Sequence, residues 1–142
     1  MSLYCFGKLL VDADLSPSVL SIPHVMIGRI DPVDAEALDD IQELSEDGIY
    51  FSICDDEGSA GQLWTGATDS PSDDLRLTRL GRVVHALLHC REIQMGGIAF
   101  VDGGIDTIRR GSREECWRWF SNEIKRPWDN MDNPLLIWSR GA

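Results

Sequence analysis

The sequence lacks the features that mark membrane, secreted and disulfide-rich proteins. No apolar run reaches the roughly 18 residues that a membrane-spanning helix needs. The N-terminal segment has no basic region before its apolar residues, so we expect no secretory signal. Four cysteines occur without Cys-x-x-Cys spacing, each in or beside an apolar segment. This pattern predicts buried free thiols and a reducing, cytoplasmic location.

Motifs for catalysis and for cofactor binding are also absent. The chain has no G-x-S-x-G, no P-loop and no G-x-G-x-x-G after a predicted strand. Residues 55–58 (Asp-Asp-Glu-Gly) lack the alternating spacing of a calcium loop. His85 and His89 have a spacing that can hold a metal, but Ala86 stands where a metalloprotease has glutamate. We therefore predict no catalytic residue, no metal and no cofactor.

Basic residues are scarce in the first half of the chain. Residues 1–74 contain 16 acidic and two basic residues, whereas residues 75–142 contain eight acidic and 11 basic residues. The formal net charge of the whole chain is -11. Nucleic-acid-binding proteins are usually basic, so we expect no nucleic acid and no membrane as partner. A strongly negative field instead favours encounter with a basic protein.

The composition predicts one folded domain over residues 1–142. With 43% hydrophobic residues and five tryptophans, the chain can bury a core. We expect a single α+β domain with a mainly antiparallel sheet and three helices, in the order ββα-ββα-ββα-β. The predicted strands are Leu3–Val11, His24–Ile30, Ile49–Cys54, Gln62–Ala67, Ile98–Val101, Ile105–Arg109 and Leu135–Ser139. The predicted helices run from Pro32 to about Glu46, from about Leu75 to Cys90, and from Arg113 to a point before Pro127.

Local signals define several ends of these elements. Asp31 is a candidate N-cap of the first helix, and Ser112 with Glu115 forms a candidate capping box for the third. The glycines at 96–97 predict a turn. Residues 102–104 (Asp-Gly-Gly) predict a hairpin that joins two antiparallel strands.

The first predicted helix carries its acidic residues on one face. On a helical wheel of residues 33–47 the acids fall within an arc of about 120° opposite the apolar side chains. Like charges one turn apart cost about 0.2–0.5 kcal/mol per pair, so a face needed only for solubility would gain from mixed charges. The pattern therefore favours a partner site over a solvated face, which remains the alternative. The predicted partner-binding residues are Glu36, Asp39, Asp40, Glu43, Glu46, Asp47, Asp55, Asp56, Glu57 and Trp64.

Three functional hypotheses follow from these patterns. Small size, acidity and an α+β domain without catalytic motifs are typical of bacterial immunity proteins, which neutralise a toxin encoded beside them. The leading hypothesis is therefore an inhibitor of a basic toxin such as a nuclease. One alternative is a small enzyme or ligand-binding domain that uses His85 and His89. The other is a phage or secretion-system accessory protein, and the oligomeric state stays open.

Overall fold

The protein is a single α+β domain, as the sequence predicts, seen in a computed structural model that describes residues 4–11, 21–54, 79–124 and 132–140. The predicted strand at 62–67 lies outside these ranges. In chain order the elements are β1 (Tyr4–Val11), β2 (Val25–Ile27), α2 (Pro32–Asp39), the 3-10 turn η1 (Gln42–Leu44), β3 (Ile49–Ile53), α4 (Arg79–Leu88), β4 (Ile93–Val101), β5 (Thr107–Gly111), α5 (Arg113–Ile124) and β6 (Pro134–Ser139).

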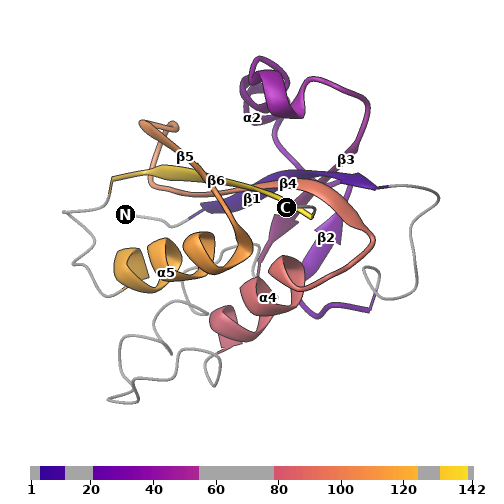
Figure 1. Cartoon of the computed structure of the whole chain (residues 1–142). Helices are drawn as coiled ribbons and strands as arrows, with labels where there is room; N and C mark the ends of the chain where they lie inside the picture. The colour runs from indigo at the N-terminus through magenta and orange to yellow at the C-terminus, as the bar shows by residue number, and fades with distance from the viewer. Residues whose placement is uncertain (1–3, 12–20, 55–78, 125–131, 141–142) are drawn as a thin grey trace.

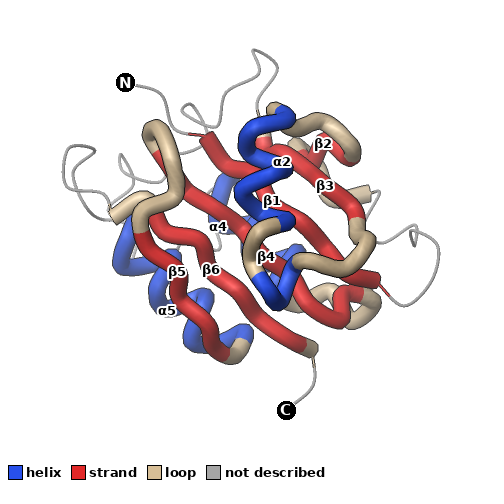
Figure 2. The backbone as a smooth tube through the Cα atoms, turned by 90° about the horizontal axis from the view of Figure 1, so that it is seen from above, coloured by secondary structure: helices blue, strands red, loops and turns tan. Residues whose placement is uncertain are grey.

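One six-stranded sheet in the order β2-β3-β1-β4-β6-β5 forms the middle layer. Its strand pairs are antiparallel except β5 and β6, which are parallel. Helices α4 and α5 cover one face, and α2 lies on the other (Figure 1). Figure 2 looks down on that second face and shows α2 and η1 above the central strands.

The alternation of side chains along the strands divides the core into two parts. In β1, Cys5 and Leu9 pack on the side of α4 and α5, in the larger cluster. Phe6 belongs to the smaller cluster beneath α2 and η1, together with Leu38 and Leu44. Both faces of the central strands are therefore buried, and the sheet is sandwiched between two helical layers.

The predicted turn at Gly96 and Gly97 is wrong, because both glycines lie inside β4. A Cβ at Gly96 would overlap the indole ring of Trp138, and one at Gly97 would overlap the side chain of Leu44. The glycine pair leaves room for a large side chain on each face of the sheet. Close packing against β4, rather than a change of chain direction, explains these residues.

The predicted hairpin after β4 is also wrong, although the chain does turn there with Gly103 at φ 111°. Strand β6 lies between β4 and β5 and pairs with both. Asn133, just before β6, accepts hydrogen bonds from the Asp102 amide to its Oδ1 (2.9 Å) and from the Asp106 amide to its carbonyl (3.0 Å). These bonds attach both sides of the turn between β4 and β5 to the residue that precedes β6. Strands β1 and β2 are likewise separated by β3.

Both predicted helix caps are confirmed. Asp31 Oδ1 accepts a hydrogen bond from the Val33 amide at 2.9 Å. Ser112 Oγ accepts from the Glu115 amide, and Glu115 Oε1 accepts from the Ser112 amide, both at 3.1 Å. This reciprocal pair is a complete capping box, so the starts of α2 and α5 follow directly from the sequence.

The first helix is shorter than predicted and ends at Asp39 instead of Glu46. Ile41 is extended (φ -89°, ψ 125°), and η1 follows it. In a helix that ended at Glu46 the Leu44 carbonyl would lie in the last turn without a helical partner, whereas in the structure it accepts a hydrogen bond from Lys8 Nζ at 2.6 Å. The break also directs the Leu44 side chain onto the sheet beside Gly97.

Replacing Lys8 tests this explanation. Lys8 is 2% exposed, and Lys8→Met keeps an unbranched side chain but removes the donor to the Leu44 carbonyl and to Asp39. We expect the free energy of unfolding to fall by about 1–3 kcal/mol, the cost of an unsatisfied buried polar group. Urea denaturation measures it. Arg29→Met, at an exposed position, should change the value by less than about 0.5 kcal/mol; an equally small loss for Lys8→Met would contradict the explanation.

Candidate functional site

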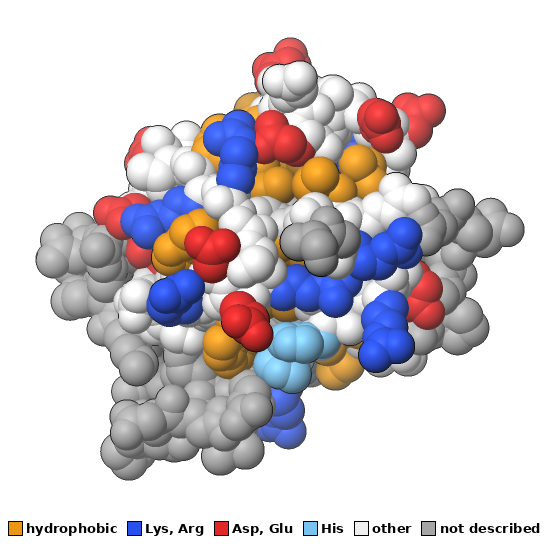
Figure 3. Space-filling view, viewed as in Figure 1, with side chains coloured by type: hydrophobic (Ala, Val, Ile, Leu, Met, Phe, Trp, Pro, Cys, Tyr) orange, Lys and Arg blue, Asp and Glu red, His pale blue; other side chains and the backbone are white. Residues whose placement is uncertain are grey.

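All acidic residues of the first half that the structure describes lie in one layer of the fold. We call residues 31–47, which comprise α2, η1 and their flanks, the acidic layer. It contains eight Asp or Glu residues and no Lys or Arg. Figure 3 shows acidic side chains on the outermost surface over α2 and Lys and Arg side chains across the middle of the same view. The acidic layer therefore stands out from a surface of mixed charge.

Asp39 is bound to the sheet rather than directed away from the core. Its Oδ1 accepts hydrogen bonds from Lys8 Nζ at 2.8 Å and from the Tyr50 hydroxyl at 2.5 Å. The Lys8 ammonium also lies 5.1 Å from the centroid of the Tyr50 ring. The hydrogen bond from Lys8, followed by that from Tyr50, lowers the pKa of Asp39. The helical wheel predicted Asp39 opposite every core contact, and this prediction is wrong because its carboxylate binds Lys8 and Tyr50 of the sheet.

Glu43 is held by a base from the second half of the chain. Its carboxylate pairs with the Arg110 guanidinium on β5, and this hydrogen bond lowers the pKa of Glu43. The side chain of Glu43 is 24% exposed. Asp39 and Glu43 thus attach the acidic layer at two points, one to β1 and one to β5.

The other acids of the predicted site differ from these two. Glu36, Asp40, Glu46 and Asp47 are exposed, and no ion pair to them occurs within the described ranges. Asp40 is the C-cap of α2, and its side chain is exposed. The remaining predicted residues, Asp55, Asp56, Glu57 and Trp64, lie outside the described residues. The part of the site that the structure describes is therefore one group of four free carboxylates beside two anchored ones.

The histidines form an aromatic stack on α4. The rings of His85 and His89 lie 4.0 Å apart and stacked, and His85 meets the edge of Trp117 at 5.4 Å. Within the part of the chain that the structure describes, no group of three or more His, Cys, Asp or Glu residues is arranged to hold a metal ion. The contacts of this pair are thus those of side-chain packing between α4 and α5.

All four cysteines are buried free thiols, as predicted. Burial raises the pKa of Cys5 and raises that of Cys116 to about 12. Burial, followed by a hydrogen bond to Glu92, also raises the pKa of Cys90. Because the thiolate is the reactive form, these three thiols are poor nucleophiles at neutral pH.

Trp119 on α5 takes part in internal packing. Its ring lies against Gly111, and the Arg109 guanidinium carbon lies 6.0 Å from the ring centroid. Arg109 also pairs with Asp132 at 3.2 Å. Half-buried and supported from two sides, Trp119 stabilises the junction of β5 and α5.

The acid dependence of stability tests the anchoring of Asp39. Because its folded pKa is lowered, its stabilisation is present above the ordinary carboxyl pKa and is lost as the pH falls through the lower folded value. We expect the wild-type urea midpoint to decrease below about pH 4, and we expect Asp39→Asn to weaken that decrease. Glu36→Gln, which removes an exposed carboxylate from the same helix, should keep the wild-type slope. Equal slopes in all three proteins would show that Asp39 is not an anchor.

Comparisons with protein-family models, with curated proteins and with solved structures found no match to the chain. Within the described ranges, no helix is long and apolar enough to cross a membrane. The functional argument therefore depends on the acidic layer itself.

Proposed function

We propose that the protein binds a basic protein through the acidic layer, and that it acts as an immunity protein that neutralises a basic toxin such as a nuclease. One observation supports this most directly. Two acids of the layer are paired with bases of the sheet, and four exposed acids beside them have no ion-pair partner among the described residues. The layer is thus attached through some of its carboxylates and offers the others to solvent.

The attachment of the acidic layer to the sheet favours binding of a partner protein. Binding a partner costs conformational entropy when side chains and loops must be ordered, and a surface that is already attached reduces that cost. Lys8 and Arg110 connect the acidic layer to β1 and to β5, at two places on the same sheet. The backbone that carries the free carboxylates is therefore attached to the sheet.

The charge suits a nucleic-acid-binding partner. A nuclease needs a basic surface because its substrate is a polyanion. Carboxylates at a protein interface complement such a surface, accelerate association and disfavour acidic competitors. An acidic layer that covers the basic surface would prevent substrate from binding. Inhibition then follows from occupancy and needs no catalytic residue.

The direct experiment begins with the partner. The immobilised protein is used to isolate binding proteins from extracts of its source cells, and each purified binder is assayed for nuclease activity with increasing amounts of this protein. The proposal expects a basic binder whose activity is lost at a 1:1 ratio. A binder whose activity persists at saturation would refute inhibition and favour an accessory role.

Single charge reversals then locate the interface. Glu36→Lys, Asp40→Lys and Glu46→Lys should each weaken affinity for the purified partner about three- to tenfold, because each replaces an attractive charge by a repulsive one. The weakening should come mainly from slower association and should shrink as salt rises from about 0.1 to 1 M. Surface plasmon resonance measures both rates.

Glu114→Lys is the matched control, since it makes the same charge change at an exposed position on α5. Glu123 is unsuitable because it is buried and accepts a hydrogen bond from the Asp132 amide. If the three reversals in the acidic layer weaken binding no more than Glu114→Lys does, the layer is a solvated face and the proposed site is wrong.

A further inference from the structure

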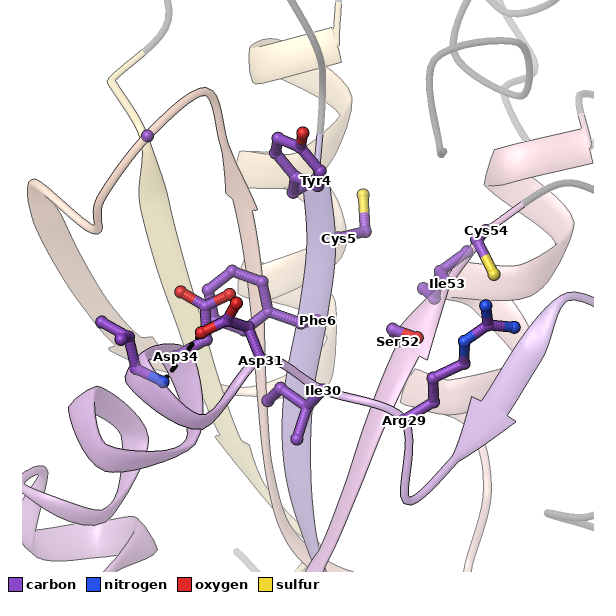
Figure 4. Close-up of a pocket in the computed structure, with 12 residues that line it drawn as sticks. Tyr4, Cys5, Phe6, Arg29, Ile30, Asp31, Asp34, Ser52, Ile53 and Cys54 are labelled. Atoms are coloured by element: carbon purple, nitrogen blue, oxygen red, sulfur yellow. Dashed lines mark hydrogen bonds between the residues drawn. The ribbon is translucent and has the colours of Figure 1, made fainter. Parts of the chain in front are cut away.

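A pocket of about 610 Å³ opens where the start of α2 meets the ends of β1 and β3. Tyr4 from β1, Ile30 from the segment before α2 and Val33 from α2 contribute its accessible apolar side chains. Figure 4 shows the carboxylates of Asp31 and Asp34 on the α2 side and the Arg29 side chain at the far end. The pocket thus combines apolar walls with two carboxylates on one side.

Exposed apolar side chains gather at this pocket. Tyr4 is 52% exposed and Val33 is 73% exposed, and both line it. They are two of the four large hydrophobic side chains that are exposed within the described residues. An apolar centre with charged groups around it is the usual composition of a protein-binding hot spot.

The electrostatics favour a cation on the α2 side. Burial and the negative charge of Asp31 raise the pKa of Asp34, so the two carboxylates lie close enough to repel each other. The positive end of the helix is already occupied, because Asp31 accepts the hydrogen bond from the Val33 amide. A cation placed between the two carboxylates would relieve their repulsion.

We propose that this pocket receives an arginine side chain of the basic partner, with its methylene groups against Ile30 and Val33 and its guanidinium on Asp31 and Asp34. Arginine fits better than lysine because a planar guanidinium can donate to two carboxylates at once. The identity of the occupant rests on the proposed function, since only a basic protein partner supplies such a side chain. The pocket would then be the anchor of an interface whose remaining contacts lie on the acidic layer.

The probe for this proposal is N-acetyl-arginine methylamide, titrated into the full-length protein and followed by methyl NMR. We expect saturable shifts at the methyl groups of Ile30 and Val33. The citrulline analogue has nearly the same shape without the charge, and it should bind at least threefold more weakly. Asp34→Asn should raise the Kd of the arginine probe about threefold, whereas Glu36→Gln, which removes a charge of α2 outside the pocket, should leave it within twofold.

Three outcomes would overturn the proposal: no saturable shift at these methyl groups, equal binding of the arginine and citrulline compounds, or equal effects of Asp34→Asn and Glu36→Gln. Failure of this proposal can be distinguished from failure of the proposed function. Failure of the probe leaves the charge-reversal experiment on the acidic layer intact, and failure of that experiment leaves a measured arginine site without the assigned partner.

Discussion

The ammonium group of Lys8 is the constraint on which the α2 side of the fold depends. It is buried beneath α2 and η1, and a buried cation is tolerated only with an opposite charge and further acceptors. Asp39 supplies the charge and the Leu44 carbonyl supplies a second acceptor. The chain leaves the helix after Asp39, extends at Ile41 and forms η1, and this path brings the Leu44 carbonyl to Lys8. One side chain on β1 thus binds both the end of α2 and η1.

The same constraint relates the stability of the acidic layer to its proposed role. Eight like charges in a segment of 17 residues would repel one another in a free peptide. Pairing Asp39 with Lys8 and Glu43 with Arg110 neutralises two of them where they meet the sheet. The others stay on the outer surface, where water screens them and where a basic partner can reach them. The bases of the sheet therefore make it possible to present a surface of one sign.

Local signals in the sequence predicted two helix starts and the turn after β4 well, but they did not predict which strands pair in the sheet. Asp31 and Ser112 mark helix starts because an N-cap acts within a few residues. The Asp-Gly-Gly turn after β4 exists, but turn residues specify a change of direction and not the neighbour of the next strand, so the insertion of β6 could not be foreseen. The prediction of a turn at Gly96 and Gly97 was wrong for a related reason. These glycines make room for the side chains of Trp138 and Leu44, which are distant in the sequence.

The candidate site was likewise predictable only in its local features. The sequence identified the acidic residues, because their number and spacing are visible without a structure. It could not distinguish the carboxylates that form ion pairs from the free ones, because Lys8 and Arg110 lie on strands distant in the sequence. A lysine in an apolar strand does not indicate which acidic residue it will pair with. The pocket at the start of α2 could not be predicted from the sequence either, because it forms only when the ends of β1 and β3 meet α2. Val33 beside the Asp31 cap is 73% exposed, and its apolar side chain at a helix start does not by itself indicate a pocket.

Hydrogen exchange in Lys8→Met tests most directly whether the Lys8 ammonium holds the acidic layer on the sheet. The amides of Asp40, Ile41 and Leu44 donate within α2 and η1, whereas those of His89 and Cys116 donate at α4 and α5. The account predicts that Lys8→Met accelerates exchange at the first three amides about tenfold or more relative to the other two, because the layer opens locally. Equal acceleration at all five amides, or none at the first three, would contradict it.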